Sequence, residues 1–290
     1  MSQYVTKIRT DAGDLPIDYN ALANLPALNT MFSNPNLLIN SDFRNPVNQR
    51  GQTTLTTNDD EWTKFYFIDR WYSQHGTIIE LLDGYIKASA SATTTAGYFC
   101  QIFEKALPAD NYTATVSVKS ISGTVKMFLK NANGTSEVVL SNGINILTTN
   151  AAVSSIEIQL MPSASVELYW IKLEQGAIAT PFVPRLYGEE LALCRRYYRN
   201  DVVRLVSYQH TSTYAYFGYN YEPMRTAPTF SYVGFGETSN HAGATAASTA
   251  VQALEGTAVD RMAIRIVFSD TNTAYYRYAS GRVILDAEIY

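Results

Sequence analysis

The chain has 290 residues, of which 46% are hydrophobic and 17% charged, so it is long enough for one large or two ordinary domains and should be globular. Its net charge of −4 disfavours a broad surface for nucleic acid or acidic membranes. The sequence lacks an apolar run of about 18 residues and an apolar signal-peptide core, which predicts a protein made in a cytoplasm with no membrane insertion.

The first 35 residues have too little apolar surface to fold alone. Prolines at positions 16, 26 and 35 exclude one long helix and predict a short helical turn between extended pieces. The apolar residues between these prolines are scattered, so the segment has no core of its own. We therefore predict that residues 1–35 form an attachment or oligomerisation segment, which packs on another copy of the chain or on a neighbouring subunit.

Residues 36–186 alternate β-rich runs with tight-turn dipeptides. In Ile156–Leu160 polar and apolar side chains alternate, as expected for a strand with one face toward water. Glycine in the dipeptides permits the positive φ of hairpin turns. The turn signals are Asp83-Gly84, Ser122-Gly123, Asn133-Gly134 and Asn142-Gly143. Short strands of this regularity predict a sandwich or a jelly roll rather than an α/β fold.

Residues 187–199 are the best helix candidate. Leu191, Cys194 and Tyr198 fall on one face of such a helix, and acidic residues precede basic ones, which suits the helix dipole. Acids and bases interleave around this segment, which favours a solvated, salt-bridged surface over a nucleic-acid site. These residues are Arg185, Glu189, Glu190, Arg195, Arg196, Arg199, Asp201 and Arg204.

The remainder of the chain returns to strand patterns, with runs at 214–221, 229–235, 261–268, 273–278 and 282–289. Residues 240–257 are rich in Ala, Gly, Ser and Thr and predict a long loop or a weak helix, while Ser280-Gly281 predicts a tight turn. The predicted fold class is all-β: a jelly-roll sandwich in 36–186, then a short helix and a second, C-terminal β-sandwich domain in 187–290.

Cysteines and aromatic residues add two expectations. Cys100 and Cys194 lie far apart without a metal-binding spacing, which favours two buried free thiols over a disulfide. The 21 tyrosines suit β-strands, and they also suit surfaces that recognise polar ligands with apolar faces.

Several segments resemble known proteins in their order along the chain. Asn36–Phe43 resembles the opening of a jelly-roll carbohydrate-binding module, and Ile68–Trp71 and the closing strand Trp170–Gly176 agree with it. The continuation through Ala179–Arg185 into Tyr187–Cys194 is similar to phage and prophage tail proteins from Gram-positive hosts.

This resemblance implies a tail-fibre or receptor-binding protein at the tip of a virion tail, released from the host by lysis. It implies a homotrimer that adheres to a polysaccharide or glycan of the host surface, with residues 187–290 as the tip domain. Other tail or baseplate proteins would be held through the N-terminal segment. The resemblance does not identify the sugar.

Catalytic patterns are weak, and we predict that the protein is not an enzyme. Asp59–Glu61, Asp69, Glu80 and Asp83 supply acids, but acids in polar loops are usually solvated, and the three histidines lack metal-binding spacing. Two rivals to an adhesin stay open: a purely structural baseplate or fibre subunit, and a polysaccharide depolymerase.

No cofactor is expected apart from a structural calcium ion. Jelly-roll modules of the kind resembled here often bind Ca²⁺ near the first and last strands through oxygen ligands. Asp42 and Glu174 fall in those two strands and are the candidate ligands. The alternative is that both are ordinary carboxylates at strand ends.

Sugar recognition pairs an aromatic ring with the C–H face of a pyranose, and polar side chains with its hydroxyls. Trp62 lies in a polar loop where a core position is hard to arrange, so we predict an exposed platform, with Asp59 and Asp60 taking hydroxyls. Trp71 and Trp170 lie within predicted strands and are expected in the core.

The second candidate site is a set of tyrosines in the C-terminal domain. Alternation along the strands places part of this set outward, where it would serve a binding surface or a trimer interface. Its members are Tyr214, Tyr216, Tyr276 and Tyr278.

Overall fold

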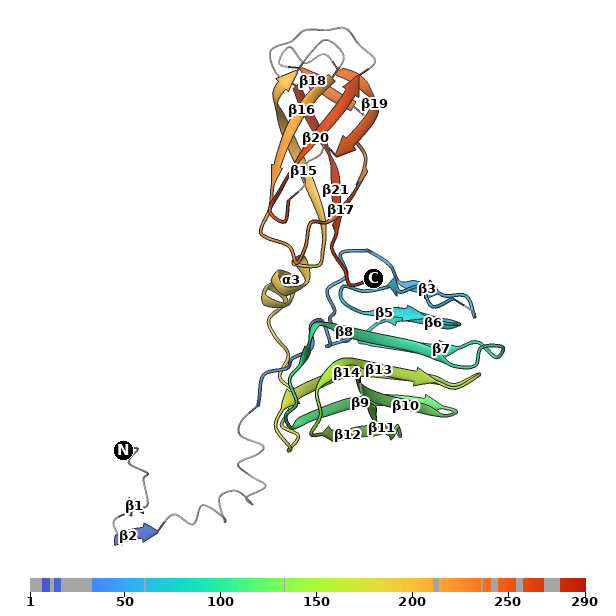
Figure 1. The fold of residues 1–290 in the computed structure, drawn as a ribbon, viewed down its shortest axis with the longest axis vertical. Helices are drawn as coiled ribbons and strands as arrows, with labels where there is room; N and C mark the ends of the chain where they lie inside the picture. The colour runs from blue at the N-terminus through green and yellow to red at the C-terminus, as the bar shows by residue number, and fades with distance from the viewer. Residues whose placement is uncertain are drawn as a thin grey trace.

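The protein is described here from a computed structural model, which covers residues 7–10, 13–16, 33–59, 61–132, 134–210, 214–235, 237–240, 245–253, 258–268 and 277–290. Two β units occupy opposite ends of an elongated body, and helix α3 (Tyr187–Arg195) lies between them (Figure 1). Strands β1 (Lys7–Thr10) and β2 (Gly13–Pro16) form an antiparallel pair. The helical turn predicted in the N-terminal segment lies outside the described residues.

The first β unit is a sandwich of two antiparallel sheets, each of six strands in the described part of the chain. One sheet contains, in spatial order, β11 (Gly134–Val139), β10 (Val125–Asn131), β13 (Val153–Leu160), β8 (Gly97–Leu107), β5 (Tyr72–Gln74) and β4 (Phe65–Tyr66). The other contains β12 (Gly143–Thr149), β9 (Tyr112–Ser122), β14 (Ser165–Gln175), β7 (Tyr85–Ala90), β6 (Thr77–Leu82) and β3 (Thr54–Thr56).

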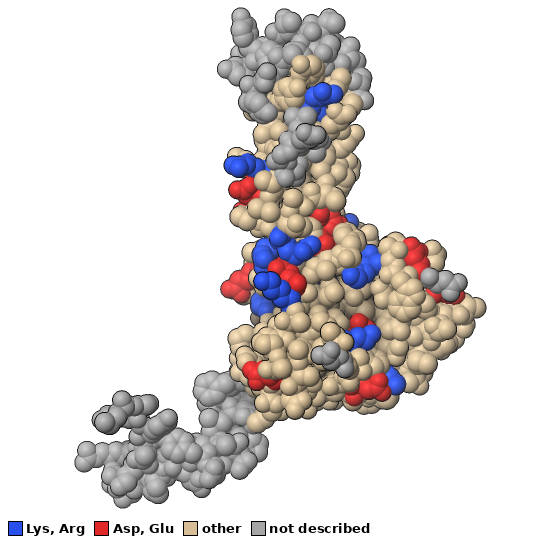
Figure 2. Space-filling model, viewed as in Figure 1, with Lys and Arg blue, Asp and Glu red and all other residues tan. Residues whose placement is uncertain are grey.

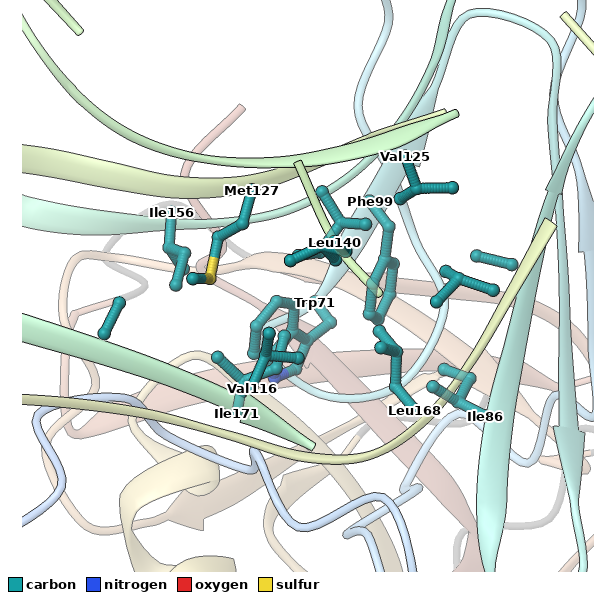
Figure 3. Packing of buried hydrophobic residues seen from close by; sticks show 14 of the residues in the cluster. Trp71, Ile86, Phe99, Val116, Val125, Met127, Leu140, Ile156, Leu168 and Ile171 are labelled. Carbon is teal, nitrogen blue, oxygen red and sulfur yellow. The ribbon is translucent and has the colours of Figure 1, made fainter. Parts of the chain in front are cut away.

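The core of the sandwich lies between these sheets (Figure 3). Inward and outward side chains alternate along the strands, so Met127 and Ile156 from one sheet face Val116 and Ile171 from the other. Three of the four predicted glycine turns have a positive φ: +81° at Gly84, +76° at Gly123 and +92° at Gly143. Gly134 has no positive φ and begins strand β11. Both cysteines are buried free thiols, as predicted.

The described C-terminal strands form one sheet that closes on itself. Strand β15 (Tyr198–His210) pairs with β21 (Arg277–Asp286) along its first part and with β16 (Tyr214–Asn220) along its last part. The ring continues through β20 (Arg261–Phe268), β19 (Thr245–Ala253) and β18 (Glu237–Asn240) back to β21, which also carries β17 (Thr229–Val233). The all-β prediction is confirmed, and here the second unit has a closed sheet.

Three local predictions differ from the structure. The helix ends at Arg195, because the chain from Tyr198 onward pairs with β21. The segment predicted as a loop or weak helix contains strand β19, which pairs with β18 and β20. Ser280-Gly281 is not a turn but lies within β21. The glycine is needed there because a Cβ would come within 2.9 Å of the Phe235 ring.

The two β units meet through a polar junction. Arg70 Nη1 lies 2.6 Å from Glu288 Oε2, and both side chains are buried. Gln49 donates from Nε2 to the Tyr198 carbonyl (2.7 Å), and Tyr66 donates to the Ile289 carbonyl (2.9 Å). Charged residues of both signs gather at this level of the molecule (Figure 2). The units are therefore joined by specific bonds rather than by the linker alone.

Asp69 is a buried carboxyl group at the centre of this junction. Its Oδ2 accepts a hydrogen bond from Gln49 Nε2 (2.9 Å), while its Oδ1 is buried without a partner in the described residues. Burial raises the pKa of Asp69 to about 7; Gln49 and Arg50 oppose this rise, and Glu288 adds to it. Cys194 and Tyr198 are the other titratable groups that face it.

We expect the stability of the protein to fall as pH rises from about 4 to about 7. Because the folded pKa of Asp69 lies above its ordinary value of 3.8, the native state holds this proton while the unfolded state releases it. The free energy of unfolding should therefore decrease across that window and level off above it. Urea titrations between about pH 4 and pH 8 measure this slope. Asp69→Asn should flatten it, and an unchanged slope in this variant would assign it to other groups.

Candidate functional site

Trp62 is exposed, as its polar loop predicts, and its ring rests on two others. The side chain is 59% exposed, and its ring centroid lies 4.3 Å from that of His75 and 5.6 Å from that of Tyr98. His75 is fixed in turn, since its Nδ1 lies 2.8 Å from the Ala96 carbonyl oxygen, which accepts only. The backbone N–H of His75 donates to the Glu61 carbonyl (2.9 Å). Trp62 is thus held as a platform.

The platform stands at one edge of an open sheet face. Pairing between the strands places the outward side chains in two rows across the sheet. The first row contains Val139, Lys126, Gln159, Tyr98 and Gln74. The second contains Glu137, Phe128, Glu157, Cys100, Tyr72 and Tyr66, of which Phe128, Cys100, Tyr72 and Tyr66 are buried, so the first row is the accessible one. We call this surface the open face.

Polar groups on the open face are arranged around its aromatic rings. Gln159 donates from Nε2 to the Tyr98 hydroxyl (3.0 Å), and Lys130 forms an ion pair with Glu157. The Lys130 ammonium lies 5.7 Å from the centroids of both Tyr98 and Phe128. The Gln159 amide and the Lys130 ammonium therefore lie beside the Tyr98 ring, on which Trp62 also rests.

The acids predicted beside Trp62 have a different role. Asp59 turns toward the neighbouring loop, where its Oδ2 accepts hydrogen bonds from Ser91 (3.3 Å) and Thr93. These bonds fix the loop that carries Trp62 and occupy one of the two oxygens that a sugar hydroxyl would need. Asp60 lies outside the described residues.

The C-terminal tyrosines form a separate surface. Tyr214 and Tyr216 alternate with the buried Ala215 and Phe217, so they face outward, with ring centroids 5.3 Å apart. Both tyrosines are half-buried.

Tyr278, also half-buried, lies across β15 from β16, and the Arg204 guanidinium is 5.5 Å from its ring. Tyr276 falls outside the described residues. The structure does not bring this set together with Trp62, which belongs to the other β unit.

Trp170 was expected in the core, and this expectation is wrong. The register of β14 turns Ile171 and Leu173 inward, so Trp170 points to the outer face of its sheet. There it is half-buried and stacks on Phe182, with centroids 4.5 Å apart and planes 9° apart. Trp71 is in the core, as predicted.

The candidate calcium ligands do not face a shared site. Asp42 is held by Arg44, which donates from Nε (2.7 Å) and Nη2 (2.9 Å). Glu174 is not an exposed strand-end carboxylate but is buried, where it accepts from Thr180 N–H (2.8 Å) and lies 3.0 Å from Lys172 Nζ. No group of three or more His, Cys, Asp or Glu suited to a metal occurs in the described part of the chain.

The ammonium group of Lys172 occupies the place among oxygen atoms where a bound cation would lie. The buried Lys172 Nζ has oxygen neighbours from Ser33 (3.1 Å), Glu174 (3.0 Å), Thr180 (2.6 and 3.2 Å) and Pro181 (3.0 Å). Oxygen donors of this kind would suit a hard cation, but here they enclose a positive charge supplied by the chain. The residues present therefore do not fit a calcium ion bound by Asp42 and Glu174.

Tyr98, Gln159 and Lys130 were missed as candidate site residues. Their alternation with apolar neighbours marks them as outward, but their meeting depends on pairing between strands far apart in the sequence. The only local indication in the sequence was that Glu157 and Gln159 are polar residues that alternate with apolar ones in strand 153–160, which places them on its outer side.

Comparisons with known proteins leave the family open. No protein-family model and no curated protein sequence matches this chain. The solved structure of PfGH50B is similar at 8% identity and a TM-score of 0.28, over 44% of this chain and 28% of that one. A TM-score this low supports no inference about fold or function. No helix in the described residues is long and apolar enough to cross a membrane.

Proposed function

We propose that the protein is a non-enzymatic adhesin that holds cell-surface carbohydrate through the open face, as a receptor-binding subunit of the phage-tail type. The observation that carries the carbohydrate part is the Trp62 ring, 59% exposed and held in place on His75 and Tyr98. A large aromatic ring that is held rigidly on the surface offers apolar contact area to a ligand at little cost in conformational entropy.

The chemistry around this ring suits a sugar. A pyranose presents C–H groups on one face, which an indole covers, and hydroxyls around its edge. Gln159 and Lys130 supply donors for those hydroxyls on the adjoining strands, and the side-chain oxygen of Gln159 supplies an acceptor. The first row, whose side chains are half-buried or exposed, continues this surface across the sheet and would accept a chain of sugar residues rather than one.

Adhesion fits the open face better than cleavage. Glycoside hydrolysis needs a protonated carboxyl group at the scissile bond and a second, free carboxylate. Glu137 and Glu157 share a row, but the first pairs with Lys126 (2.9 Å) and the second with Lys130. Because each of these carboxylates already forms an ion pair with a lysine, neither is free to act at a scissile bond, which argues against a depolymerase.

The tail-protein part of the proposal depends on the sequence resemblance. It includes a homotrimer at a virion tail tip, attachment to other tail or baseplate proteins through residues 1–35, and release from the host by lysis. The rival is a structural subunit whose exposed rings serve assembly. Binding of polysaccharide by the isolated protein separates these two functions.

Trp62→Ala should weaken polysaccharide binding by about 1–3 kcal/mol, because the variant loses a stacked aromatic face. The melting temperature should change little, since removal of an exposed ring leaves no buried cavity. Calorimetry with host cell-wall polysaccharide and a thermal melt measure the two effects.

Tyr216→Ala is the matched test of the C-terminal surface. The proposal expects binding to fall in the Trp62 variant and to persist in the Tyr216 variant. The reverse result would move the site to the C-terminal unit, and loss of polymer viscosity on incubation would indicate a depolymerase.

A further inference from the structure

A pocket of about 230 Å³ lies on the other side of the sandwich, between the entry segment 36–45 and the linker into α3. One wall is apolar and comes from Phe182, Val183 and Leu186, together with the ring of Tyr187. The opposite wall carries Asn36, Asp42 and Asn45, and the Arg185–Glu190 pair closes one end.

The pocket is built by bonds that do not depend on a ligand. Arg185 donates from Nη1 to the Leu38 carbonyl (2.8 Å) and to Glu190, while Glu190 accepts the backbone N–H of Asn40 (2.5 Å). Phe182 is fixed against Trp170. A cavity whose walls are braced on both sides loses little entropy when a ligand enters.

Its lining identifies the kind of ligand. The charged groups are already paired, Asp42 with Arg44 and Glu190 with Arg185, so the pocket does not call for a charged ligand. The exposed amide of Asn45 has no protein partner in the described residues and offers both a donor and an acceptor. Because Asn36 is already bonded to Ser41 and to backbone groups, Asn45 is the amide that a ligand would meet. Apolar surface on one wall and this amide on the other match the two aspects of a sugar ring.

The size limits the ligand to one ring. Pockets for drug-sized ligands have volumes of roughly 300–1,000 Å³, and this one is smaller, at about 230 Å³. The apolar side chains at its mouth are exposed, above all Leu186 at 73%, so no described residue covers the entrance.

We infer that this pocket binds a single neutral pyranose residue as a second carbohydrate site, separate from the open face. The inference rests on the proposed function, since it assigns a second site for the same class of ligand. Asp42 bridges to Trp170 on β14, whereas Tyr98 belongs to β8 in the facing sheet. One chain would thus hold two sugar residues on opposite sides of the sandwich, which raises its avidity for a dense glycan surface.

The test is an NMR titration of the full chain with the methyl pyranosides of glucose, galactose, mannose and N-acetylglucosamine. At least one should bind, and Tyr187→Ala and Asn45→Ala should each weaken its binding about tenfold, because each removes one wall contact. Trp62→Ala should leave its affinity within about twofold, since distant sites act independently. Asn45 is exposed, so that variant should remain folded.

Three results would overturn the inference while the proposed function stands. The methyl glycosides could fail to bind although polysaccharide binds in a Trp62-dependent way. Their binding could depend on Trp62 and not on Tyr187 or Asn45. Tyr187→Ala could lower the oligomer mass in light scattering and leave glycoside binding intact, which would make this surface an interface between copies. Failure of both polysaccharide and glycosides to bind would remove the proposed function as well.

Discussion

Glu288→Gln should lower the free energy of unfolding by about 3–5 kcal/mol, the cost of leaving one charge of a buried ion pair without its partner. Glu288 accepts from Arg70 at both oxygens, from Nη1 (2.6 Å) and from the backbone N–H (3.1 Å). Arg70 is buried and its guanidinium lies 3.7 Å from the Tyr197 ring, so it has no path to water when the carboxylate is neutralised. Urea titration at neutral pH measures the loss.

Glu222→Gln is the matched control. Its carboxylate also pairs with an arginine, Arg199, but the Glu222 side chain is 77% exposed. Arg199 is buried but keeps Asp201 as a second partner (2.8 Å), and a carboxylate this exposed contributes at most about 1 kcal/mol, so this variant should remain near the wild type. Equal losses in the two variants would show that burial of the Arg70–Glu288 pair does not set the cost of neutralising its carboxylate.

Such a junction has no signature in the sequence. Arg70 and Glu288 are 218 positions apart, and each lies in a segment that reads as an ordinary turn or strand end. Burial of a charge is visible only after the two units have met. The same holds for Asp69, which the sequence presented as an acid in a polar loop and the structure places in a buried cluster.

Local chemistry predicted the elements whose conformation is decided locally. Gly84 and Gly123 adopt positive φ in tight turns because a hairpin requires it, and the alternation in 156–160 belongs to β13. Strand β20 spans the predicted residues 261–268. In each case a few neighbouring residues are sufficient to fix the backbone.

The predictions that failed depend on distant contacts. Gly281 permits close approach of the Phe235 ring rather than a turn, and β19 is a strand because β18 and β20 flank it. The exposure of Trp62 could be predicted from its polar loop. The open face could not, because Tyr98 and Lys130 come together only through the pairing of β8, β13 and β10.

Trp71→Ala should lower the free energy of unfolding by about 3–5 kcal/mol, which is the range for removal of a large aromatic side chain from a core. The Trp71 ring is fully buried, with centroids 4.9 Å from that of Phe99 and 5.2 Å from that of Phe43. Its Nε1 donates to the Asn40 carbonyl (2.8 Å), so truncation would leave a cavity and also a buried acceptor without its donor.

Trp62→Ala removes the same number of atoms and is therefore the control for Trp71→Ala. The two rings differ in burial: one is fully buried and the other is 59% exposed. Chemical denaturation of both variants should show a loss of several kcal/mol for Trp71 and less than about 1 kcal/mol for Trp62. A large loss at Trp62 would mean that its stacking on His75 and Tyr98 supports the fold, and the ring would then no longer count as a surface reserved for a ligand.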